Sequence, residues 1–252
     1  MNGERTERLR TFIEERRRVT LADIAAEFSV SPATVRRDLG ALAERGEIRR
    51  IRGGAVAVRQ APPELPVVHR AANQADAKAR IGKAAADLVR DGETIFLSSG
   101  TTALEVARHL RDRAGLTVLT NSLLVVNMLI ESSDIEVIVL GGQLRRSEMS
   151  LIGHVAEGAL RELRAAKTIL GIRAIHPQQG LTNDYLPETL TDRAILGLGG
   201  EVIVVADHTK CGRAAAAFVA PVTAMDLLVT DEATPDAFVE ELTTRGVRVL
   251  RV

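Results

Sequence analysis

The sequence predicts an α/β protein made of a small, mainly helical N-terminal module and a larger, mostly parallel open sheet with helices on its faces. Three observations lead to this fold class. Apolar residues recur at helical spacing before residue 60, strand-length apolar runs alternate with helical stretches after residue 70, and prolines crowd between the two parts. At about 150 residues per domain, 252 residues make one large or two modest domains.

The first part carries the patterns of three helices and a hairpin. Apolar side chains recur about one helical turn apart: Leu9, Phe12 and Ile13 in the first helix, Leu21, Ile24, Ala25 and Phe28 in the second, and Val35, Leu39 and Leu42 in the third. Thr20 and Ser31 are N-cap residues for the second and third helices, and Gly46 ends the third. Residues 48–58, interrupted by the glycine pair at 53–54, predict a short hairpin.

A proline-rich segment separates the two parts. Pro62, Pro63 and Pro66 are three of the chain's eight prolines. Because proline removes a backbone donor and disfavours helix at the residue before it, this segment predicts an extended linker. We therefore expect an N-terminal domain at residues 1–59, a linker at 60–70 and a second domain at 71–252.

Apolar runs of strand length and helical stretches alternate along the second part. The runs lie at residues 94–97, 116–119, 135–140, 168–170, 202–206 and 227–229. The helical stretches lie at 78–89, 103–110, 123–130, 155–163 and 190–196. This alternation is typical of a parallel sheet with helices on its faces.

Composition excludes several classes of protein. With 46% apolar and 26% charged residues and no run of about 18 apolar residues, the chain is neither disordered nor a membrane span. The charged N-terminus is unlike a signal peptide, and the single cysteine, Cys211, forms no intrachain disulfide, so we expect a cytoplasmic protein. The five histidines lie at least 22 residues apart, which argues against a metal site, and no dinucleotide or P-loop motif indicates a cofactor.

The net charge of zero hides an asymmetry between the two parts. Residues 1–60 hold 13 arginines against 9 carboxylates, a net charge of +4, and residues 61–252 carry the opposite charge of −4. Two short helices joined by a tight turn, the second rich in arginine, are typical of a helix-turn-helix. The scarcity of aromatic residues, 2% of the chain, argues against recognition of single strands by stacking. We therefore expect double-stranded DNA as the polyanion.

The residues expected to contact DNA lie on the third helix and on the hairpin. At about 100° per helical residue, the inward-facing Val35 leaves the N-terminal part of that helix exposed on its other side. Arginine binds guanine edges in the major groove, and serine and threonine suit phosphates or base edges. The expected contacts are Ser31, Thr34, Arg36, Arg37, Arg49, Arg50 and Arg52. The alternative is a small helical module whose solvated arginine face contacts protein.

These motifs carry a family resemblance. The run Arg36-Arg37-Asp38-Leu39, the preceding 21–25 segment and the Gly53-Gly54-Ala55 hairpin resemble the winged helix-turn-helix of the DeoR family. Arg52 stands where that family often has histidine, which keeps the positive charge and bears only on sequence preference. The resemblance implies binding to double-stranded operator DNA.

Small and polar residues follow the predicted strands of the second part. Because ligands of open α/β sheets bind outside the carboxyl ends of the strands, we expect an anion site there. Gly100 lets the backbone approach an anion, and the N–H groups and dipole of the following helix favour phosphate. The candidate residues are Lys78, Ser98, Ser99, Gly100, Thr101, Thr102, Asn121, Ser122, Gly141, Gly142, Asp207 and Lys210. The alternative is that the serines and threonines only cap helices.

The same loops resemble, in order, the sensor domain of the DeoR family. The matching segments are 97–102, 120–123, 140–142, 180–182 and 206–210. That domain is similar to ribose-5-phosphate isomerase and binds phosphorylated sugars or related metabolites. Ser98, Ala166, His208 and Cys211 depart from the family pattern, and these departures bear on the sugar part of the ligand more than on its phosphate.

The resemblance covers nearly the whole chain and implies a transcriptional regulator. We expect a repressor of a carbohydrate-metabolism operon that a phosphorylated sugar relieves. Because one recognition helix reads few base pairs, we expect at least a homodimer. The alternative is a sugar-phosphate isomerase with an accessory DNA-binding domain, which needs a general base such as Asp207, Asp231 or Glu105, although no paired carboxylate motif singles one out.

Overall fold

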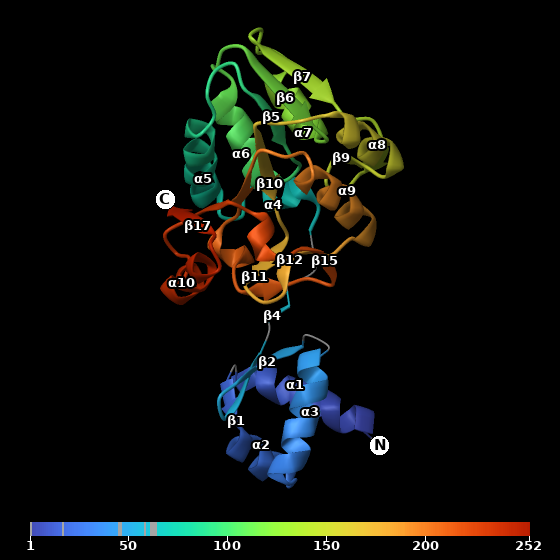
Figure 1. Cartoon of the computed structure of the whole chain (residues 1–252), viewed down its shortest axis with the longest axis vertical. Helices are drawn as coiled ribbons and strands as arrows, with labels where there is room; N and C mark the ends of the chain where they lie inside the picture. The colour runs from blue at the N-terminus through green and yellow to red at the C-terminus, as the bar shows by residue number, and fades with distance from the viewer. Residues whose placement is uncertain (1, 17, 45–46, 58, 61–64) are drawn as a thin grey trace. The chain divides into compact units, whose positions relative to one another are not determined.

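The chain forms two compact units, Met1–Gln60 and Ala61–Val252. The computed structural model describes all residues except 1, 17, 45–46, 58 and 61–64 (Figure 1). The first unit is mainly helical and the second is built on a parallel sheet, so the predicted α/β class is confirmed. Among the described residues, no helix combines the length and the apolar character that a membrane crossing requires.

The first unit packs helices against a small antiparallel sheet. Its elements are α1 (Asn2–Arg16), β1 (Arg18–Thr20), α2 (Leu21–Phe28), α3 (Pro32–Glu44), β2 (Ile48–Ile51), β3 (Gly54–Ala57) and β4 (Arg59–Gln60). The strands β1, β3 and β2 pair antiparallel in that order. The predicted helices and hairpin are present, β1 was not predicted, and the predicted helix end at Gly46 lies outside the described residues.

One apolar core holds this unit together. Ile13 of α1 and both Val35 and Leu42 of α3 are fully buried in it. The start of α2 is fixed by a capping box: Thr20 Oγ1 accepts from the backbone N–H of Asp23 at 3.1 Å, and the Asp23 carboxylate accepts from the N–H of Thr20 at 2.9 Å. These contacts hold α3 and its exposed face in a defined place within the unit.

Within the described residues, the second unit is built on a seven-stranded parallel sheet. Its strands, in the order in which they lie side by side, are β17 (Arg248–Arg251), β16 (Leu227–Thr230), β13 (Glu201–Val205), β10 (Lys167–Gly171), β5 (Thr94–Leu97), β6 (Leu116–Thr120) and β7 (Ile135–Val139). Every neighbouring pair is parallel.

The helices and smaller strands surround this sheet. The helices are α4 (Val67–Arg70), α5 (Ala75–Asp87), α6 (Thr101–Leu110), α7 (Leu123–Leu129), α8 (His154–Glu162), α9 (Leu186–Leu196) and α10 (Asp236–Thr244), with the 3-10 turns η1 (His208–Lys210) and η2 (Val222–Ala224). The smaller strands are β8 (Gln143–Arg145), β9 (Ser150–Ile152), β11 (Ala174–His176), β12 (Gly180–Asn183), β14 (Arg213–Ala214) and β15 (Ala217–Ala220). Strands β8 and β9 form a hairpin, and β11, β12 and β15 pair antiparallel.

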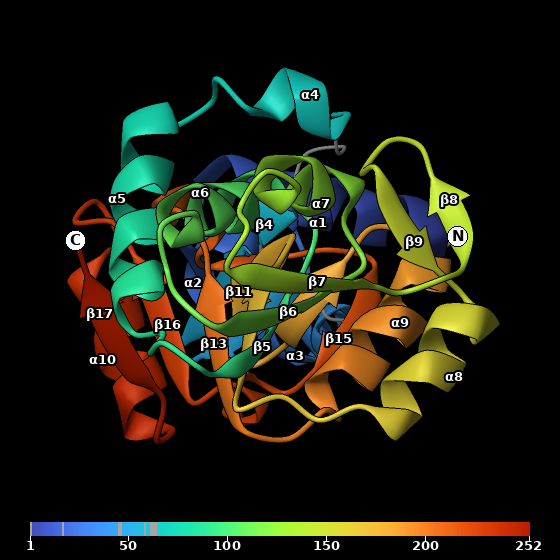
Figure 2. The ribbon, with the colours of Figure 1, turned by 90° about the horizontal axis from the view of Figure 1, so that it is seen from above.

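Both faces of the parallel sheet are buried. Successive strand residues point to opposite faces, so Ile95 and Leu97 of β5 pack into the cluster with α5 and α6, while Phe96 packs into the cluster with α8 and α9. Figure 2 shows α5 and α9 on opposite sides of this unit. Burial on both faces explains why these strands have continuous apolar runs in the sequence.

The order of the strands reverses between β5 and β10. From β5 the chain adds β6 and β7 on one side, and β10, β13, β16 and β17 follow on the other side. In open α/β sheets such a topological switch point leaves a crevice at the carboxyl ends of the strands, where ligands bind. The sheet topology therefore places a ligand site beyond Leu97 and Gly171.

Part of the segment predicted as linker is helical. The helix α4 follows Pro66 directly, and Val67 is buried while its N–H donates to the carbonyl of Ser147 at 2.7 Å. The prolines at 62 and 63 lie outside the described residues. Contact with a distant loop, rather than local sequence preference, accounts for this helix.

Candidate functional site

The N-terminal part of α3 is exposed and carries the predicted polar residues. Ser31 Oγ accepts from the backbone N–H of Thr34 at 3.2 Å and lies 3.0 Å from its hydroxyl, which caps the helix. Arg36 and Arg37 are exposed, whereas Val35 between Thr34 and Arg36 is fully buried. The structure therefore brings these four predicted residues to one end of α3, with both guanidinium groups available to solvent.

An ion pair ties this helix to α1. Arg5 donates to Asp38 through two nitrogens, Nε and Nη2, each at 3.0 Å. Asp38 follows Arg37 directly, so its carboxylate lies on the helix that also carries the exposed arginines. The bidentate pairing fixes the geometry between α1 and α3 and compensates the charge of that carboxylate.

The hairpin of the first unit is held against β1. A side chain at Gly54 would place its Cβ only 2.0 Å from the carbonyl oxygen of Val19, so glycine is required for the close pairing of β3 with β1. Arg50 and Arg52 are exposed on the hairpin, and the side chain of Arg49 lies outside what the structure describes. The two described arginines are positioned as a basic wing.

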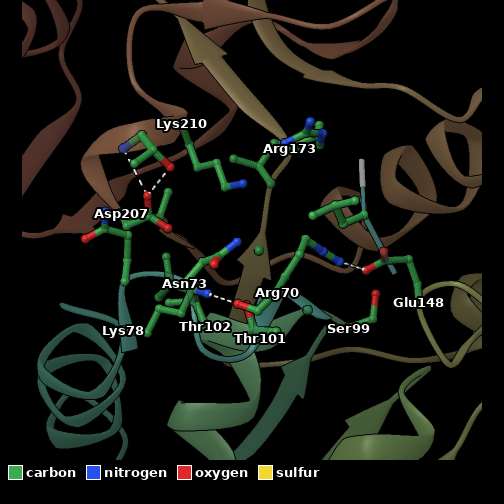
Figure 3. A pocket seen from close by; sticks show the side chains of 18 of the residues that line it. Arg70, Asn73, Lys78, Ser99, Thr101, Thr102, Glu148, Arg173, Asp207 and Lys210 are labelled. Carbon is green, nitrogen blue, oxygen red and sulfur yellow. Dashed lines mark hydrogen bonds and ion pairs between the residues drawn. The ribbon is translucent and has the colours of Figure 1, made fainter. Parts of the chain in front are cut away.

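A cavity of about 600 Å³ lies in the second unit. It opens at the carboxyl ends of β5, β10 and β13, at the topological switch point (Figure 3). Predicted residues that line it are Lys78, Ser99, Gly100, Thr101, Thr102, Asp207 and Lys210. Its volume falls within the roughly 300–1,000 Å³ that is usual for small-molecule sites.

The helix α6 begins at this cavity. Gly100 has a φ of +112°, a conformation that other residues rarely adopt, and it turns the chain from β5 into α6. In the described part of the chain no side chain caps the N-terminus of α6. Since Thr101 and Thr102 line the cavity, the first-turn N–H groups and the positive end of the helix dipole lie at the cavity, where they can bind an anion.

Positive charges face this helix end. Figure 3 shows Lys78 and Lys210 on the side of the cavity that carries Thr101 and Thr102. Arg173 also lines the cavity, and its Nε donates to Asp184 at 2.7 Å. Lys78 is buried, and its Nζ donates to the carbonyl of Arg70 at 2.7 Å. Burial is the main cause that lowers the pKa of Lys78 to about 8. Helix N–H groups together with nearby ammonium groups provide an anion site suited to phosphate.

The loop after β13 holds Lys210 in this group. Asp207 begins η1, and its Oδ1 accepts from the N–H of Thr209 at 2.9 Å. His208 pairs instead with Asp231, with 2.7 Å between its Nδ1 and the carboxylate. Burial raises the pKa of the Cys211 thiol to about 12, so this cysteine is a protonated packing residue.

The remaining cavity wall carries carboxylates. Glu148 forms an ion pair with Arg70, and the two side chains meet at the cavity in Figure 3. Asn183 of β12 donates through Nδ2 to Glu188 at 3.0 Å and to Asp192 at 2.9 Å, and both carboxylates belong to α9. All of these residues line the cavity.

The described lining of the cavity does not include five predicted residues: Ser98, Asn121, Ser122, Gly141 and Gly142. Ser98 supports the site, because its Oγ accepts from the N–H of Gly171 at 2.9 Å and so links the ends of β5 and β10. Asn121 donates to the carbonyl of Leu151 at 3.2 Å, and Ser122 caps α7. The other two are exposed beyond β7, which lies at the edge of the sheet away from β10.

Sequence reasoning missed several cavity residues, including Arg70, Arg173, Asn183, Glu188 and Asp192. Arg173 follows the strand that ends at Gly171. The rule that ligands bind beyond the carboxyl ends of the strands could therefore have identified Arg173 from the sequence. The others lie on elements that local patterns do not connect with the sheet edge.

Comparison with known proteins agrees with the two units. Residues 5–61 match the model of the DeoR-like helix-turn-helix domain, and residues 73–232 match that of the DeoR C terminal sensor domain. The chain belongs to the DeoR family of transcriptional regulators. This membership makes it a DNA-binding transcriptional regulator with a sensor domain, and it decides against the isomerase and the protein-contact alternatives.

Curated relatives of this DeoR-family chain resemble it over nearly their whole length. The glycerol-3-phosphate regulon repressor of Escherichia coli (strain K12) is 34% identical over 231 residues, which cover 92% of this chain and 91% of the relative. The repressor GlcR of Bacillus subtilis (strain 168) is 31% identical over 98% of this chain and 95% of its own.

Solved structures resemble the fold at lower identity. The "probable sor operon regulator" from Shigella flexneri is 12% identical with a TM-score of 0.44, over 69% of this chain and 92% of its own. Ribose 5-phosphate isomerase A from Methanocaldococcus jannaschii is 19% identical with a TM-score of 0.41, over 55% of each chain.

Proposed function

We propose that the chain is a repressor of a carbohydrate-metabolism operon and that its effector is a phosphorylated sugar bound in the cavity of the second unit. The uncapped start of α6, facing Lys78 and Lys210 at the switch point of the sheet, carries this proposal within the described residues. Helix N–H groups and ammonium groups together suit a phosphate. One relative is named a repressor of the glycerol-3-phosphate regulon, which supports a phosphorylated effector.

The proposed effector contacts divide into direct and supporting groups. The loop at Ser99 and Gly100 and the first turn at Thr101 and Thr102 supply N–H and hydroxyl donors to the phosphate. Lys78 and Lys210 supply positive charge, while Asp207 and Ser98 hold the loops in place. Asn121, Ser122, Gly141 and Gly142 are left out of the site, because their contacts and positions lie elsewhere.

For DNA, we propose that α3 enters the major groove. Ser31, Thr34, Arg36 and Arg37 then contact base edges and phosphates, and Arg49, Arg50 and Arg52 hold the flanking backbone. We propose the DNA-binding domain at residues 1–59, the linker at 60–70 and the effector domain at 71–252, and the division of the chain into two units after Gln60 supports this arrangement. The exposure of the described arginines supports this division of roles.

We further propose that a homo-oligomer, at least a dimer, binds the operator. One recognition helix contacts few base pairs, and two copies reach half-sites about 34–36 Å apart, or multiples of that spacing. Release of condensed counterions makes the affinity for DNA fall steeply with salt.

The helix α4 is our candidate for coupling between effector and DNA. It follows the linker, and the backbone carbonyl of Arg70 at its end accepts a hydrogen bond from Lys78. A phosphate beside Lys78 competes for this ammonium group and so changes the restraints on α4. Coupling free energies between sites are typically about 1–3 kcal/mol, or about 5- to 150-fold in affinity.

Two measurements on the purified full chain test this function. Thermal shift with ribose 5-phosphate, fructose 6-phosphate, glycerol 3-phosphate and the unphosphorylated sugars identifies a ligand, because a ligand of the folded state stabilises it. Mobility shift on DNA from upstream of its own gene then measures release. We expect one or more phosphorylated compounds to raise the melting temperature and release DNA. Absence of any response to the whole phosphorylated set would contradict the proposal.

A further inference from the structure

The cavity is larger than a phosphate needs. At about 30 Å³ per water molecule, a phosphate group occupies the space of only a few waters, whereas the cavity measures about 600 Å³. Most of its volume is therefore left for the rest of the effector, and the side chains that line this remaining part decide which molecule fits.

The lining differs between the two sides of the cavity. The proposed phosphate contacts come from α5, α6 and η1. Three lining carboxylates come from other elements, Glu188 and Asp192 from α9 and Glu148 from the loop between β8 and β9. A fourth, Asp207, lies on the phosphate side at the start of η1. α5 and α9 lie on opposite sides of this unit (Figure 2), so the α9 carboxylates and Lys78 reach the cavity from different elements on different sides. We call Glu148, Glu188 and Asp192 the carboxylate wall.

The carboxylate wall is buried and fixed. Glu188 and Asp192 are 6% and 8% exposed, and Asn183 between them is 6% exposed. The Nδ2 group of Asn183 donates to both carboxylates, and Arg145 and Ser150 also donate to Glu188. Fixed carboxylates of this kind accept hydrogen bonds in defined directions, since each oxygen has two lone pairs.

We propose that Asn183, Glu188 and Asp192 form the subsite for the uncharged, hydroxyl-bearing part of the effector. Hydroxyl groups donate to the two carboxylates, which makes Glu188 and Asp192 specificity-determining residues. A second anionic group, such as the second phosphate of a bisphosphate or the carboxylate of an aldonate phosphate, has no proton to donate to these carboxylates and is disfavoured there. This inference rests on the proposed function, because it assumes that the phosphate binds at α6.

A structural role is the competing explanation. Glu188 lies in the first turn of α9, where a negative charge is favourable, and its contacts with Arg145 and Asn183 join α9 to β8 and β12. Arg213 of β14 also lines the cavity and adds a positive charge to it. A purely structural role predicts that substitutions change the melting temperature without changing the preference among ligands.

Isothermal titration of the full chain separates these explanations. The probes are inorganic phosphate and two matched pairs, fructose 6-phosphate with fructose 1,6-bisphosphate and glucose 6-phosphate with 6-phosphogluconate. The variants are Glu188→Gln and Asp192→Asn, which keep size and remove charge. Glu240→Gln, on the exposed side of α10, is the matched control.

We expect the wild-type chain to bind the better monophosphate at least about tenfold more tightly than its partner with two anionic groups. In Glu188→Gln or Asp192→Asn, affinity for the monophosphate falls about ten- to a hundredfold, as for the loss of a hydrogen bond to a charged group. The ratio of the affinities for the monophosphate and for its partner with two anionic groups becomes smaller, and the affinity for inorganic phosphate stays unchanged. The control variant matches the wild type in every titration.

The outcomes distinguish the two proposals. If inorganic phosphate and the four titrated sugar compounds all fail to bind the wild type, and ribose 5-phosphate and glycerol 3-phosphate give no thermal shift, the proposed function fails. If a monophosphate binds but both variants keep the wild-type affinity and ratio, the hydroxyl subsite is overturned while the phosphate site stands. Asn183 contacts each carboxylate through its own hydrogen bond, so each variant removes one carboxylate and leaves the other. If one variant fails to fold, the affinities of the other variant decide whether the hydroxyl subsite exists.

Discussion

We expect Lys78 to make the affinity for the proposed effector depend on pH. Its side chain is buried beside the proposed phosphate site, and burial lowers its pKa from 10.5 to about 8. A bound phosphate favours the charged ammonium and raises this pKa in the complex. Below pH 8 the ammonium is charged with and without ligand, so the affinity is flat. Above pH 8 the free protein loses the proton that the complex retains, so the affinity falls.

The expected size follows from the pKa of the free protein. The second pKa of a phosphate ester is about 6, so the ligand keeps its charge above pH 7. Since one pH unit beyond the pKa corresponds to about a factor of ten, affinity at pH 9 should be about tenfold weaker than at pH 7. Titration calorimetry of the full chain at the two pH values, with the tightest sugar phosphate, measures this ratio.

The variant Lys78→Met assigns the effect to this residue. It removes the charge but keeps an unbranched apolar chain in a buried position, so the fold is retained. We expect weaker binding at pH 7 and no further loss at pH 9. Equal affinity of the wild type at both pH values, or the same loss in Lys78→Met, would refute the assignment.

Three further predictions concern single contacts. In mobility shifts, Arg37→Ala should lower the free energy of binding to operator DNA by about 1–3 kcal/mol and relax the base preference. Arg50→Ala should weaken binding to operator and random DNA alike. An equal loss on both DNAs for Arg37→Ala would contradict its role in base recognition. Lys210→Ala should weaken the sugar phosphate by about 1.5–3 kcal/mol in calorimetry and leave DNA binding intact, and a loss of DNA binding would count against its assignment. Arg5→Ala should weaken DNA binding because it leaves the Asp38 carboxylate unpaired, and adding Asp38→Asn should restore part of it; a double variant no better than Arg5→Ala alone would show that charge compensation is not the cause.

The parallel sheet was predictable because its local pattern and its burial agree. Residues such as Ile95, Phe96 and Leu97 are apolar in succession because both faces of the sheet are covered. The strand β1 was missed for the opposite reason. It has three residues, its pattern is exposed–buried–exposed, and it exists through pairing with β3 at Gly54.

The candidate site was predictable where one loop contains both the turn and the donors. Gly100, Thr101 and Thr102 come shortly after β5, and the rule that ligands bind beyond the carboxyl ends of the strands selected them from the sequence. The same rule also selected Gly141 and Gly142, which are not among the described residues that line the cavity. Neighbouring strands are about 4.8 Å apart, so the edge of a seven-stranded sheet lies far from its middle. The residues near β5 and β10 share the cavity, whereas those beyond the edge strand β7 do not.

The carboxylate wall had no local signal. Arg70 and Glu148 are 78 residues apart and meet through α4, which formed within the predicted linker. Asn183 and Asp192 lie on β12 and α9, whose positions depend on pairing with β15 and packing on α8. Such long-range contacts form the carboxylate side of the cavity, and only the three-dimensional structure brings these residues together.

We propose that effector binding in the cavity and operator binding by α3 are coupled. Thermodynamic linkage requires that operator DNA weakens effector binding by the same factor by which the effector weakens operator binding. The most direct measurement titrates the sugar phosphate into the full chain with and without saturating operator at fixed salt. We predict effector affinity about 5- to 150-fold weaker in the presence of operator. Identical affinities in the two series, for an oligomer that binds both ligands, would contradict the account.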